Sequence, residues 1–315
     1  MKFVVTSSPH IRGKRNTQNI MLDVIIALLP TLIAGTVIFG MRALLVTLVC
    51  VAAAVAAEYL CGMIIYKHGT VKDLSAVVTG LLLALTLPAT VPYWVAAVGG
   101  AFATMVVKGL CGGLGKNIFN PALAARAFLV MFWPVSMVRF VAPGAVDGVA
   151  SATPLHHMVM PALPEESLGQ MFIGNIGGCI GEVCTLALLM GGIYLVVRGV
   201  ISLRIPAAYL GTVAVLTLVF SKGDNAILWM LYSLLGGGVV LGALFMATDY
   251  ATSPVTPKGQ IVYGVGCGVL TVIFRYFGLF PEGVTYAILL MNACAWGFDR
   301  FMAPRRFGIK KGETV

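Results

Sequence analysis

Residues 20–40 read I-M-L-D-V-I-I-A-L-L-P-T-L-I-A-G-T-V-I-F-G and contain one charged residue, Asp23. A helix of this length can cross the hydrocarbon core of a bilayer, which takes about 20 apolar residues. The rest of the 315-residue chain is similar: 59% of the residues are hydrophobic, 10% are charged, and the mean hydropathy is +0.96. Soluble domains are about half apolar and a quarter charged. The sequence therefore predicts an all-α integral membrane protein, with residues 1–315 forming one polytopic domain.

Hydropathy predicts ten membrane-spanning segments. Two of them, 74–88 and 118–133, are short for a straight crossing and contain Pro88 and Pro121. Short, interrupted segments of this kind are typical of broken half-helices that line an internal site. The ten segments are 20–40, 43–66, 74–88, 93–110, 118–133, 171–198, 205–221, 226–247, 260–278 and 284–301.

The Lys and Arg residues predict the orientation of these spans. A cytoplasmic N-terminus places most of them, Lys108 included, on the inner side. The exceptions are Arg42, Arg139 and Lys222, which fall outside, and Arg126 and Arg275, which fall within spans. By the positive-inside rule, segments 1–19 and 302–315 are expected in the cytoplasm and loop 134–170 outside. The net charge of +9 reflects this distribution and suits anionic membrane lipid, so we predict no binding of nucleic acid.

The two halves of the chain share a pattern. In the first, Gly99-Gly100 precede a span that ends in G-K-N-I-F-N-P-A (115–122). In the second, Gly236-Gly237-Gly238 precede a span that ends in M-A-T-D-Y-A-T-S-P (246–254). Five spans in each half would make the halves inverted repeats, as in many transporters. The two polar turns are then expected to line one internal site.

Four polar residues within or beside the apolar runs are candidates for that site or for an ion path: Asn120, Asp249, Glu58 and Glu182. Asn120 and Asp249 belong to the two polar turns. An acid at mid-bilayer costs about 3 kcal/mol, so it usually faces a partner or a water path. Glu58 and Glu182 therefore either line an ion or proton path or pair with a buried arginine, Arg126 or Arg275. Asp23 and Asp299 fall closer to the ends of their runs.

The sequence contains no pattern typical of a metal site or of a hydrolase. The seven cysteines form no CxxC and no Cys/His cluster, so they are interpreted as packing thiols and no metal site is predicted. His156 and His157 follow Ser151, but the strand-turn-helix elbow and oxyanion hole of a hydrolase are missing. We predict no catalytic residue of this chain's own.

The stretch D-G-V-A-S-A-T-P-L (147–155) is by itself a small-residue turn before a proline. It stands in order with further stretches along the chain. These are S-P-H (8–10), G-K-N-I-F-N-P-A (115–122), G-E (181–182), M-A-T-D-Y-A-T-S-P with T-P-K-G-Q (246–260), and E-G-V-T-Y-A-I-L-L-M-N (282–292). With them the chain resembles the family of the D subunit of the Rnf ion-translocating electron-transport complex (the RnfD/NqrB family). A more distant resemblance is to the B subunit of the Na⁺-translocating NADH:quinone reductase. The length favours the Rnf protein.

The resemblance implies a covalent flavin. In the family, a motif of the form Asp-x-x-Ser/Thr-Gly-Ala-Thr carries FMN in a phosphoester to the threonine, made by a dedicated flavin transferase. Here Asp147, Ala152 and Thr153 match the motif, whereas Ala150 and Ser151 depart from it. Thr153 is therefore the expected acceptor, and Ser151 is the nearest other hydroxyl. The resemblance leaves open whether a second, non-covalent flavin is present.

The resemblance also implies the role and the partners. The complex would pass electrons between reduced ferredoxin and NAD⁺, coupled to Na⁺ or H⁺ movement across the cytoplasmic (inner) membrane of a bacterium. The partners would be the other Rnf subunits: the flavin-bearing G subunit, the membrane-embedded A and E subunits, the C subunit and the ferredoxin-like B subunit. This chain has no Rossmann fingerprint and no Fe–S cysteine spacing, so NAD⁺ and ferredoxin are expected to bind elsewhere.

Alternatives remain open at this point. The chain could be the corresponding subunit of the quinone reductase, a solute channel or transporter, or a membrane scaffold without a cofactor. A channel would suit the expected fold, because the family's fold resembles urea and ammonium channels. Covalent flavin separates the electron-carrying role from a channel or a scaffold.

Overall fold

The computed structural model describes residues 16–66, 73–113, 115–143, 164, 166–223, 225–278 and 283–303. All secondary-structure elements within these ranges are helices, and no β-strand occurs among them. One isolated β-bridge joins Pro88 and Cys179. The prediction of an all-α protein is confirmed. Segment 147–155, with its proposed flavin site, lies outside the described residues.

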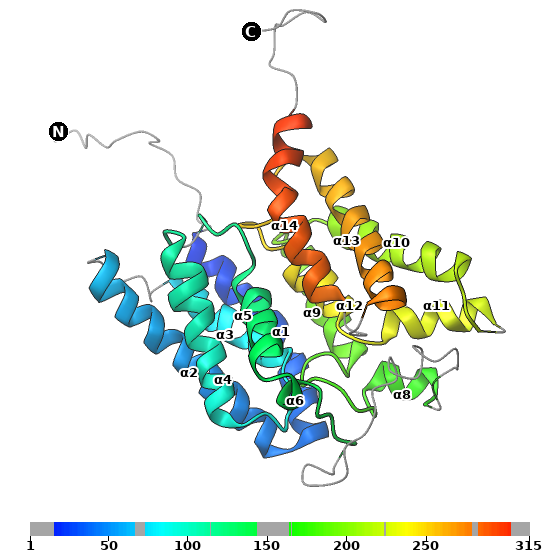
Figure 1. Cartoon of the computed structure of the whole chain (residues 1–315), viewed down its shortest axis with the longest axis horizontal. Helices are drawn as coiled ribbons and strands as arrows, with labels where there is room; N and C mark the ends of the chain where they lie inside the picture. The colour runs from blue at the N-terminus through cyan, green and yellow to red at the C-terminus, as the bar shows by residue number, and fades with distance from the viewer. Residues whose placement is uncertain are drawn as a thin grey trace, which may run out of the picture.

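The first half of the chain forms a bundle of long and short helices (Figure 1). Its elements are α1 (Thr17–Phe39), α2 (Met41–Cys61), η1 (Gly62–Tyr66), α3 (Ser75–Leu85), α4 (Tyr93–Ala101), η3 (Phe102–Gly109), α5 (Pro121–Phe132) and α6 (Pro134–Met137). The η segments are π-helical and continue the preceding α-helix. Helix α3 packs between α1, α2 and α5, so this short apolar helix lies inside the bundle.

The second half packs beside the first. Its elements are α8 (Leu168–Ile173), α9 (Thr185–Val197), α10 (Arg204–Val219), α11 (Ala226–Leu235), α12 (Val239–Leu241), η4 (Gly242–Met246), α13 (Pro257–Phe277) and α14 (Val284–Phe301). Helices α1 and α9 join the two halves. In Figure 1 the start of α1 and the end of α14 lie at one end of the molecule, whereas α6 and α8 lie at the opposite end.

Three helices in the described part of the chain are long and apolar enough to cross a membrane: Thr17–Phe39, Met41–Ile64 and Pro257–Phe277. A fourth crossing would be Ala226–Leu235 with Val239–Met246, which bend by 62° at the break between them. The remaining apolar helices are shorter. The chain is thus a multi-pass membrane protein with interrupted helices. The number of ten membrane spans remains a prediction.

Two predicted spans are not continuous helices: 226–247, which is broken between α11 and α12, and 171–198. Segment 171–198 divides into the end of α8, a non-helical stretch at 174–184, and α9. Gly174 ends α8 with a φ of 109°, which side-chain-bearing residues rarely adopt. The stretch then pairs with the chain after α3: Ile180 N–H donates to the Leu87 carbonyl (3.0 Å), and Gly181 N–H donates to the Leu85 carbonyl (2.8 Å). These bonds satisfy buried backbone groups that a helix would otherwise pair internally.

The ends of the half-helices are capped by side chains. Asn120 Oδ1 accepts hydrogen bonds from Ala122 N–H (3.0 Å) and Leu123 N–H (3.3 Å), and so begins α5. At the break after α11, the Arg275 guanidinium donates to the carbonyls of Ser233 (2.5 Å) and Gly236 (2.7 Å). Each cap supplies partners that a helix end lacks, which permits a helix to stop inside an apolar bundle.

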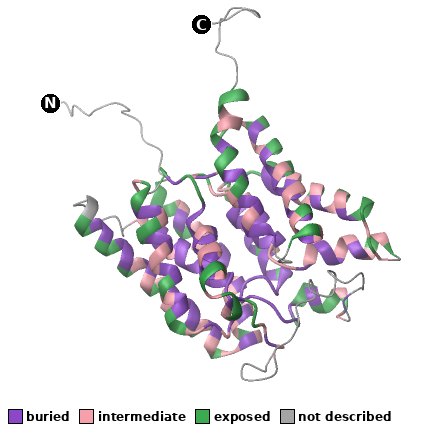
Figure 2. Cartoon of the chain, in the orientation of Figure 1, coloured by how far each residue is buried: buried purple, intermediate pink, exposed green. Residues whose placement is uncertain are grey.

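The core follows the shared faces of these helices (Figure 2), and its buried side chains run from α1 to α14. All seven cysteines are free; five are buried, and Cys111 and Cys294 are exposed. The interpretation of most cysteines as packing residues agrees with this burial.

Candidate functional site

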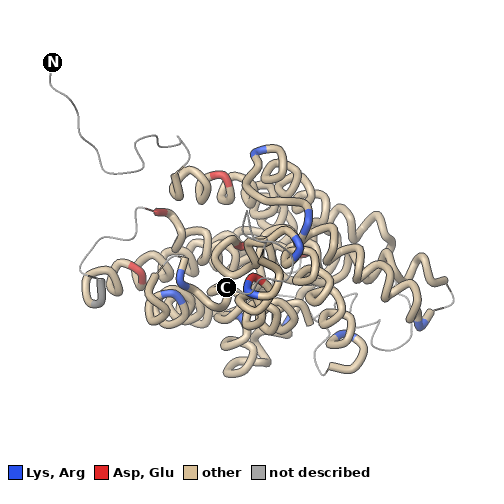
Figure 3. The backbone as a smooth tube through the Cα atoms, turned by 90° about the horizontal axis from the view of Figure 1, so that it is seen from above, with Lys and Arg blue, Asp and Glu red and all other residues tan. Residues whose placement is uncertain are grey.

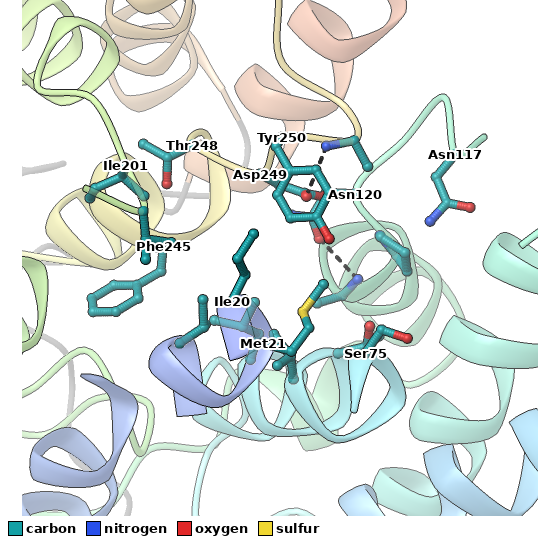
Figure 4. A pocket seen from close by; sticks show the side chains of 18 of the residues that line it. Ile20, Met21, Ser75, Asn117, Asn120, Ile201, Phe245, Thr248, Asp249 and Tyr250 are labelled. Carbon is teal, nitrogen blue, oxygen red and sulfur yellow. Dashed lines mark hydrogen bonds between the residues drawn. The ribbon is translucent and has the colours of Figure 1, made fainter. Parts of the chain in front are cut away.

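A cavity of about 80 Å³ lies where the two polar turns meet, near the end of the molecule that holds the start of α1 (Figure 4). The turn at 117–122 contributes one wall, and the turn at 248–251 contributes another. Apolar residues of α1, α9 and η4 complete the lining, and Ser75 and Lys108 add polar groups from α3 and η3. This volume has room for several water molecules.

Asn120 and Asp249 both line this cavity. Asn120 Nδ2 donates to the carbonyl of Met246 (3.2 Å), which ties the first polar turn to the end of η4. Asp249 accepts hydrogen bonds from Ala251 N–H (3.2 Å) and the Thr252 hydroxyl (3.3 Å). Burial raises the pKa of the Asp249 carboxyl above its ordinary value, and these two hydrogen bonds oppose that shift. The structure thus brings the two predicted residues to one place, and their role stays a prediction.

A buried ion pair adjoins the cavity. Lys108 Nζ lies 2.5 Å from Glu58 Oε1 and also donates to the Ser75 hydroxyl. Ser75 in turn donates to Asp73 Oδ1 (2.5 Å) just before α3. Lys108 and Glu58 are each 3% exposed. The cluster therefore connects η3, α2 and the start of α3 through charged and polar groups in an apolar bundle.

This ion pair corrects one sequence-based expectation. Of the two alternatives for Glu58, pairing with an arginine, Arg126 or Arg275, is wrong, because the partner is Lys108. Lys108 is buried beside this acid, and the side of the membrane on which it lies stays a prediction. The signal that could have identified it is its place inside the apolar run 93–110, because a charge within a span usually faces a partner.

Glu182 lies in the non-helical stretch before α9 and is 5% exposed. Its Oε1 accepts a hydrogen bond from Cys179 N–H (3.0 Å), and its Oε2 has no hydrogen-bond partner in the part of the chain that the structure describes. Arg126 donates to Cys179 Sγ (3.6 Å), whereas Arg275 binds the two carbonyls at the end of α11. The expected pairing of Glu182 with either arginine is therefore wrong among these residues.

Charged residues are few and scattered along the described backbone (Figure 3). The acids near the helix ends have structural partners. Asp23 accepts hydrogen bonds from the Tyr194 hydroxyl (3.0 Å) and from Arg198 (3.1 Å), which joins α1 to the end of α9. Asp299 accepts from the backbone N–H groups of Val255 (3.0 Å) and Thr256 (2.9 Å) at the start of α13. Both acids hold elements together at the ends of the bundle.

The predicted flavin motif is not placed by the structure. Asp147, Ser151, Ala152 and Thr153 lie outside the described residues, as do His156 and His157. In the described residues, no group of three or more His, Cys, Asp and Glu side chains could hold a metal ion.

The fold and the cavity define the class of protein: a multi-pass helical membrane protein whose interrupted helices surround an internal polar site. A match to the NQR2, RnfD, RnfE family extends over residues 4–308. The chain belongs to this family, and the resemblance seen in the sequence is confirmed.

Similar proteins match along their whole length. The D subunit of the Na(+)-translocating ferredoxin:NAD(+) oxidoreductase complex of Acetobacterium woodii is 47% identical over 317 residues, which cover 99% of this chain and 97% of the relative. The D subunit of the proton-translocating ferredoxin:NAD(+) oxidoreductase complex of Clostridium ljungdahlii is 41% identical over 322 residues, covering 98% and 97%. The D subunit of the ion-translocating oxidoreductase complex of Stutzerimonas stutzeri is 36% identical over 332 residues, covering 94% and 93%.

Proposed function

We propose that this chain is the flavin-carrying membrane subunit of an Rnf complex. The complex passes electrons between reduced ferredoxin and NAD⁺ and couples this transfer to Na⁺ or H⁺ translocation. One observation carries the proposal: the D subunits of two ferredoxin:NAD(+) oxidoreductase complexes match 98–99% of the chain at 41–47% identity. A relative named for Na⁺ and another named for protons match to similar degrees, so the similarity favours neither ion.

Thr153 is the proposed attachment point for FMN, with Asp147, Ser151 and Ala152 shaping its turn. Support for this position comes from the sequence motif, since segment 144–163 lies outside the described residues. A bound flavin would supply one- and two-electron chemistry, and the chain would supply its tether and position.

The proposed sidedness follows from the charge pattern. The termini face the cytoplasm, loop 134–170 faces outward, and the chain lies in the cytoplasmic membrane of a bacterium. The described ends of the chain share one end of the molecule, and α6 and α8 share the other, which supports this arrangement (Figure 1). The flavin-bearing G subunit would donate or accept electrons on the outer side. The membrane-embedded A and E subunits, the C subunit and the ferredoxin-like B subunit would complete the complex, and a flavin transferase would mature it.

We propose further that the two halves are inverted repeats of a channel-like fold. In each half, a helix near consecutive glycines becomes π-helical: α4 contains Gly99-Gly100 and continues as η3, and α12 follows Gly236-Gly237-Gly238 and continues as η4. A polar turn comes next in each half, and both turns line the same cavity. The mixed polar and apolar lining suits either ion access or a second, non-covalent flavin. Flavin released on denaturation, in addition to the covalent fraction, would identify the latter.

The decisive experiment is co-expression of the chain with its flavin transferase, followed by denaturing electrophoresis and intact-mass analysis. The expected protein fluoresces in the gel and is heavier by FMN less one water. Thr153→Ala is expected to abolish both signals, whereas the matched variant Ser151→Ala retains them. An adduct that persists in Thr153→Ala would move the site elsewhere, and a wild-type chain without flavin would refute the electron-carrying role.

A second experiment tests the sidedness. A cysteine replaces Glu165 in a chain whose seven cysteines are substituted. Intact cells are then treated with a membrane-impermeant thiol reagent. Labelling in intact cells is expected, and labelling only in inverted vesicles would reverse the proposed orientation.

A further inference from the structure

Helices α1 and α9 pack antiparallel through small residues. A Cβ atom on Gly191 would overlap the Ala27 carbonyl oxygen, and one on Gly35 would overlap the Ile180 carbonyl oxygen. Ala27, Thr31 and Gly35 are spaced by four residues, so they form one stripe on α1. Thr31 lies between these two contacts on the same stripe, so it is directed towards the segment between Ile180 and Gly191, which contains Thr185 at the start of α9.

These two threonines are unusual among the buried hydroxyls. Thr47, Thr217 and Thr271 each donate to the carbonyl four residues earlier, at 2.9, 2.7 and 2.7 Å. By contrast, Thr31 Oγ1 and Thr185 Oγ1 have no hydrogen-bond partner within the described ranges, although the residues are only 1% and 2% exposed. Buried polar groups are nearly always satisfied, so exceptions at one place require an explanation.

Glu182 provides a third buried side-chain oxygen without a hydrogen-bond partner among the described residues. Its Oε2, buried and without a partner among the described residues, lies 3.3 Å from the position of a Cβ on Gly238, at the break between α11 and α12. Gly192 contacts Leu244, and Gly238 approaches Glu182, so segments 238–244 and 182–192 run in the same direction. Gly238 therefore lies near the start of α9, the helix that begins at Thr185.

Glu182 is held so that one oxygen stays available. Its Oε1 is fixed by Cys179 N–H, and Arg126 contacts the Cys179 thiol. A carboxylate and two hydroxyls at a helix break are hard oxygen ligands, which suit a hard cation better than a soft metal. Discontinuous membrane helices commonly place such ions near the middle of the bilayer.

We propose that Glu182, Thr31 and Thr185 form a binding site for one dehydrated monovalent cation, and that this cation is Na⁺. The carboxylate balances the charge of the cation, and the hydroxyls replace part of its hydration shell. The inference rests on the proposed ion-translocating function and assigns the residues that hold the ion.

The test uses the purified complex, and it measures thermal unfolding and ²²Na⁺ binding. Sodium chloride is titrated against choline chloride at constant ionic strength. Na⁺ is expected to raise the unfolding temperature, because a ligand that binds only the folded state stabilises it. Thr31→Val and Thr185→Val are each expected to weaken Na⁺ binding roughly tenfold, through the loss of one ligand. Glu182→Gln is expected to abolish it.

Thr47→Val is the matched control, because it removes a buried hydroxyl that already has a partner, and it should bind Na⁺ as the wild type does. Absence of Na⁺ binding in the wild type would overturn the site. So would unchanged binding in Glu182→Gln and both test threonine variants, or equal weakening in the Thr47→Val control. Covalent flavin, measured on the same samples by in-gel fluorescence, separates failure of this site from failure of the electron-carrying role.

Discussion

Glu58 and Glu182 occupy similar surroundings but have different partners. Both are nearly inaccessible, at 3% and 5% exposure, in the apolar interior. Glu58 meets Lys108 at 2.5 Å, whereas Glu182 forms no ion pair among the residues that the structure describes. An acid with a buried cation is part of a closed pair that joins helices. An acid without such a cation can bind one as a ligand, so the comparison predicts opposite results for the same substitution.

The largest effect is expected from Glu58→Gln. It leaves the Lys108 ammonium buried without its carboxylate, and breaking a buried pair from one side typically costs about 3–5 kcal/mol. We expect a lower yield of assembled complex and a lower unfolding temperature, measured by size-exclusion chromatography and thermal unfolding of the purified complex. Replacing both partners, with Lys108→Met added, should restore much of the loss, since the resulting neutral pair leaves no uncompensated buried charge. Equal instability of the single and double variants would contradict this account.

Glu182→Gln should have the opposite profile. The amide oxygen can still accept the hydrogen bond from Cys179 N–H, so assembly and flavin content are expected to stay near those of the wild type. Ion uptake driven by electron transfer, measured in reconstituted vesicles, should fall at least about tenfold, equivalent to about 1.4 kcal/mol. Normal pumping by an assembled Glu182→Gln complex would remove Glu182 from the ion path and would end its contrast with Glu58.

Arg275 extends the comparison to a buried cation whose guanidinium donates hydrogen bonds to backbone carbonyls. Its two contacts, with Ser233 and Gly236, end α11 before the break. Arg275→Lys keeps the charge but loses the planar fork, so one carbonyl should lose its donor. We expect a loss of about 1 kcal/mol in stability, the usual value of one hydrogen bond, with Glu58 variants as the reference for a larger loss. Thermal unfolding measures the change, and a loss as large as that of Glu58→Gln would show that the arginine also neutralises an acid.

The smallest effect concerns Asp249 at the cavity. Burial raises the pKa of its carboxyl above the ordinary 3.8, so the folded protein binds this proton more tightly than the unfolded chain does. The ionised carboxylate then reduces stability at pH values above the raised pKa, and the reduction disappears as pH falls below 3.8. Asp249→Asn should therefore be slightly more stable at neutral pH, with the gain shrinking on acidification. Thermal unfolding across pH measures it, and a gain that grows towards acid would contradict the sign.

Much of the architecture could be predicted from local pattern. Apolar runs identified the long helices α1, α2 and α13, and the Asn120-Pro121 pair identified the start of a short helix. Segment 171–198 was harder to predict, because hydropathy records how apolar a stretch is and says nothing about where its backbone hydrogen bonds go. There Gly174 ends α8, and backbone carbonyls at the end of α3 accept hydrogen bonds from the non-helical stretch.

The sequence by itself determined the membrane class, the family and the candidate residues, because composition and ordered motifs are properties of the linear chain. Only the tertiary structure decided which buried charge meets which partner. Lys108 and Glu58 are 50 positions apart, and Asn120 reaches Met246 across 126 positions. Contacts at such separations depend on how helices pack, and no local pattern specifies them. For the same physical reason, the site that we propose at Thr31, Thr185 and Glu182 depends on the packing of α1, α9 and the break before α12.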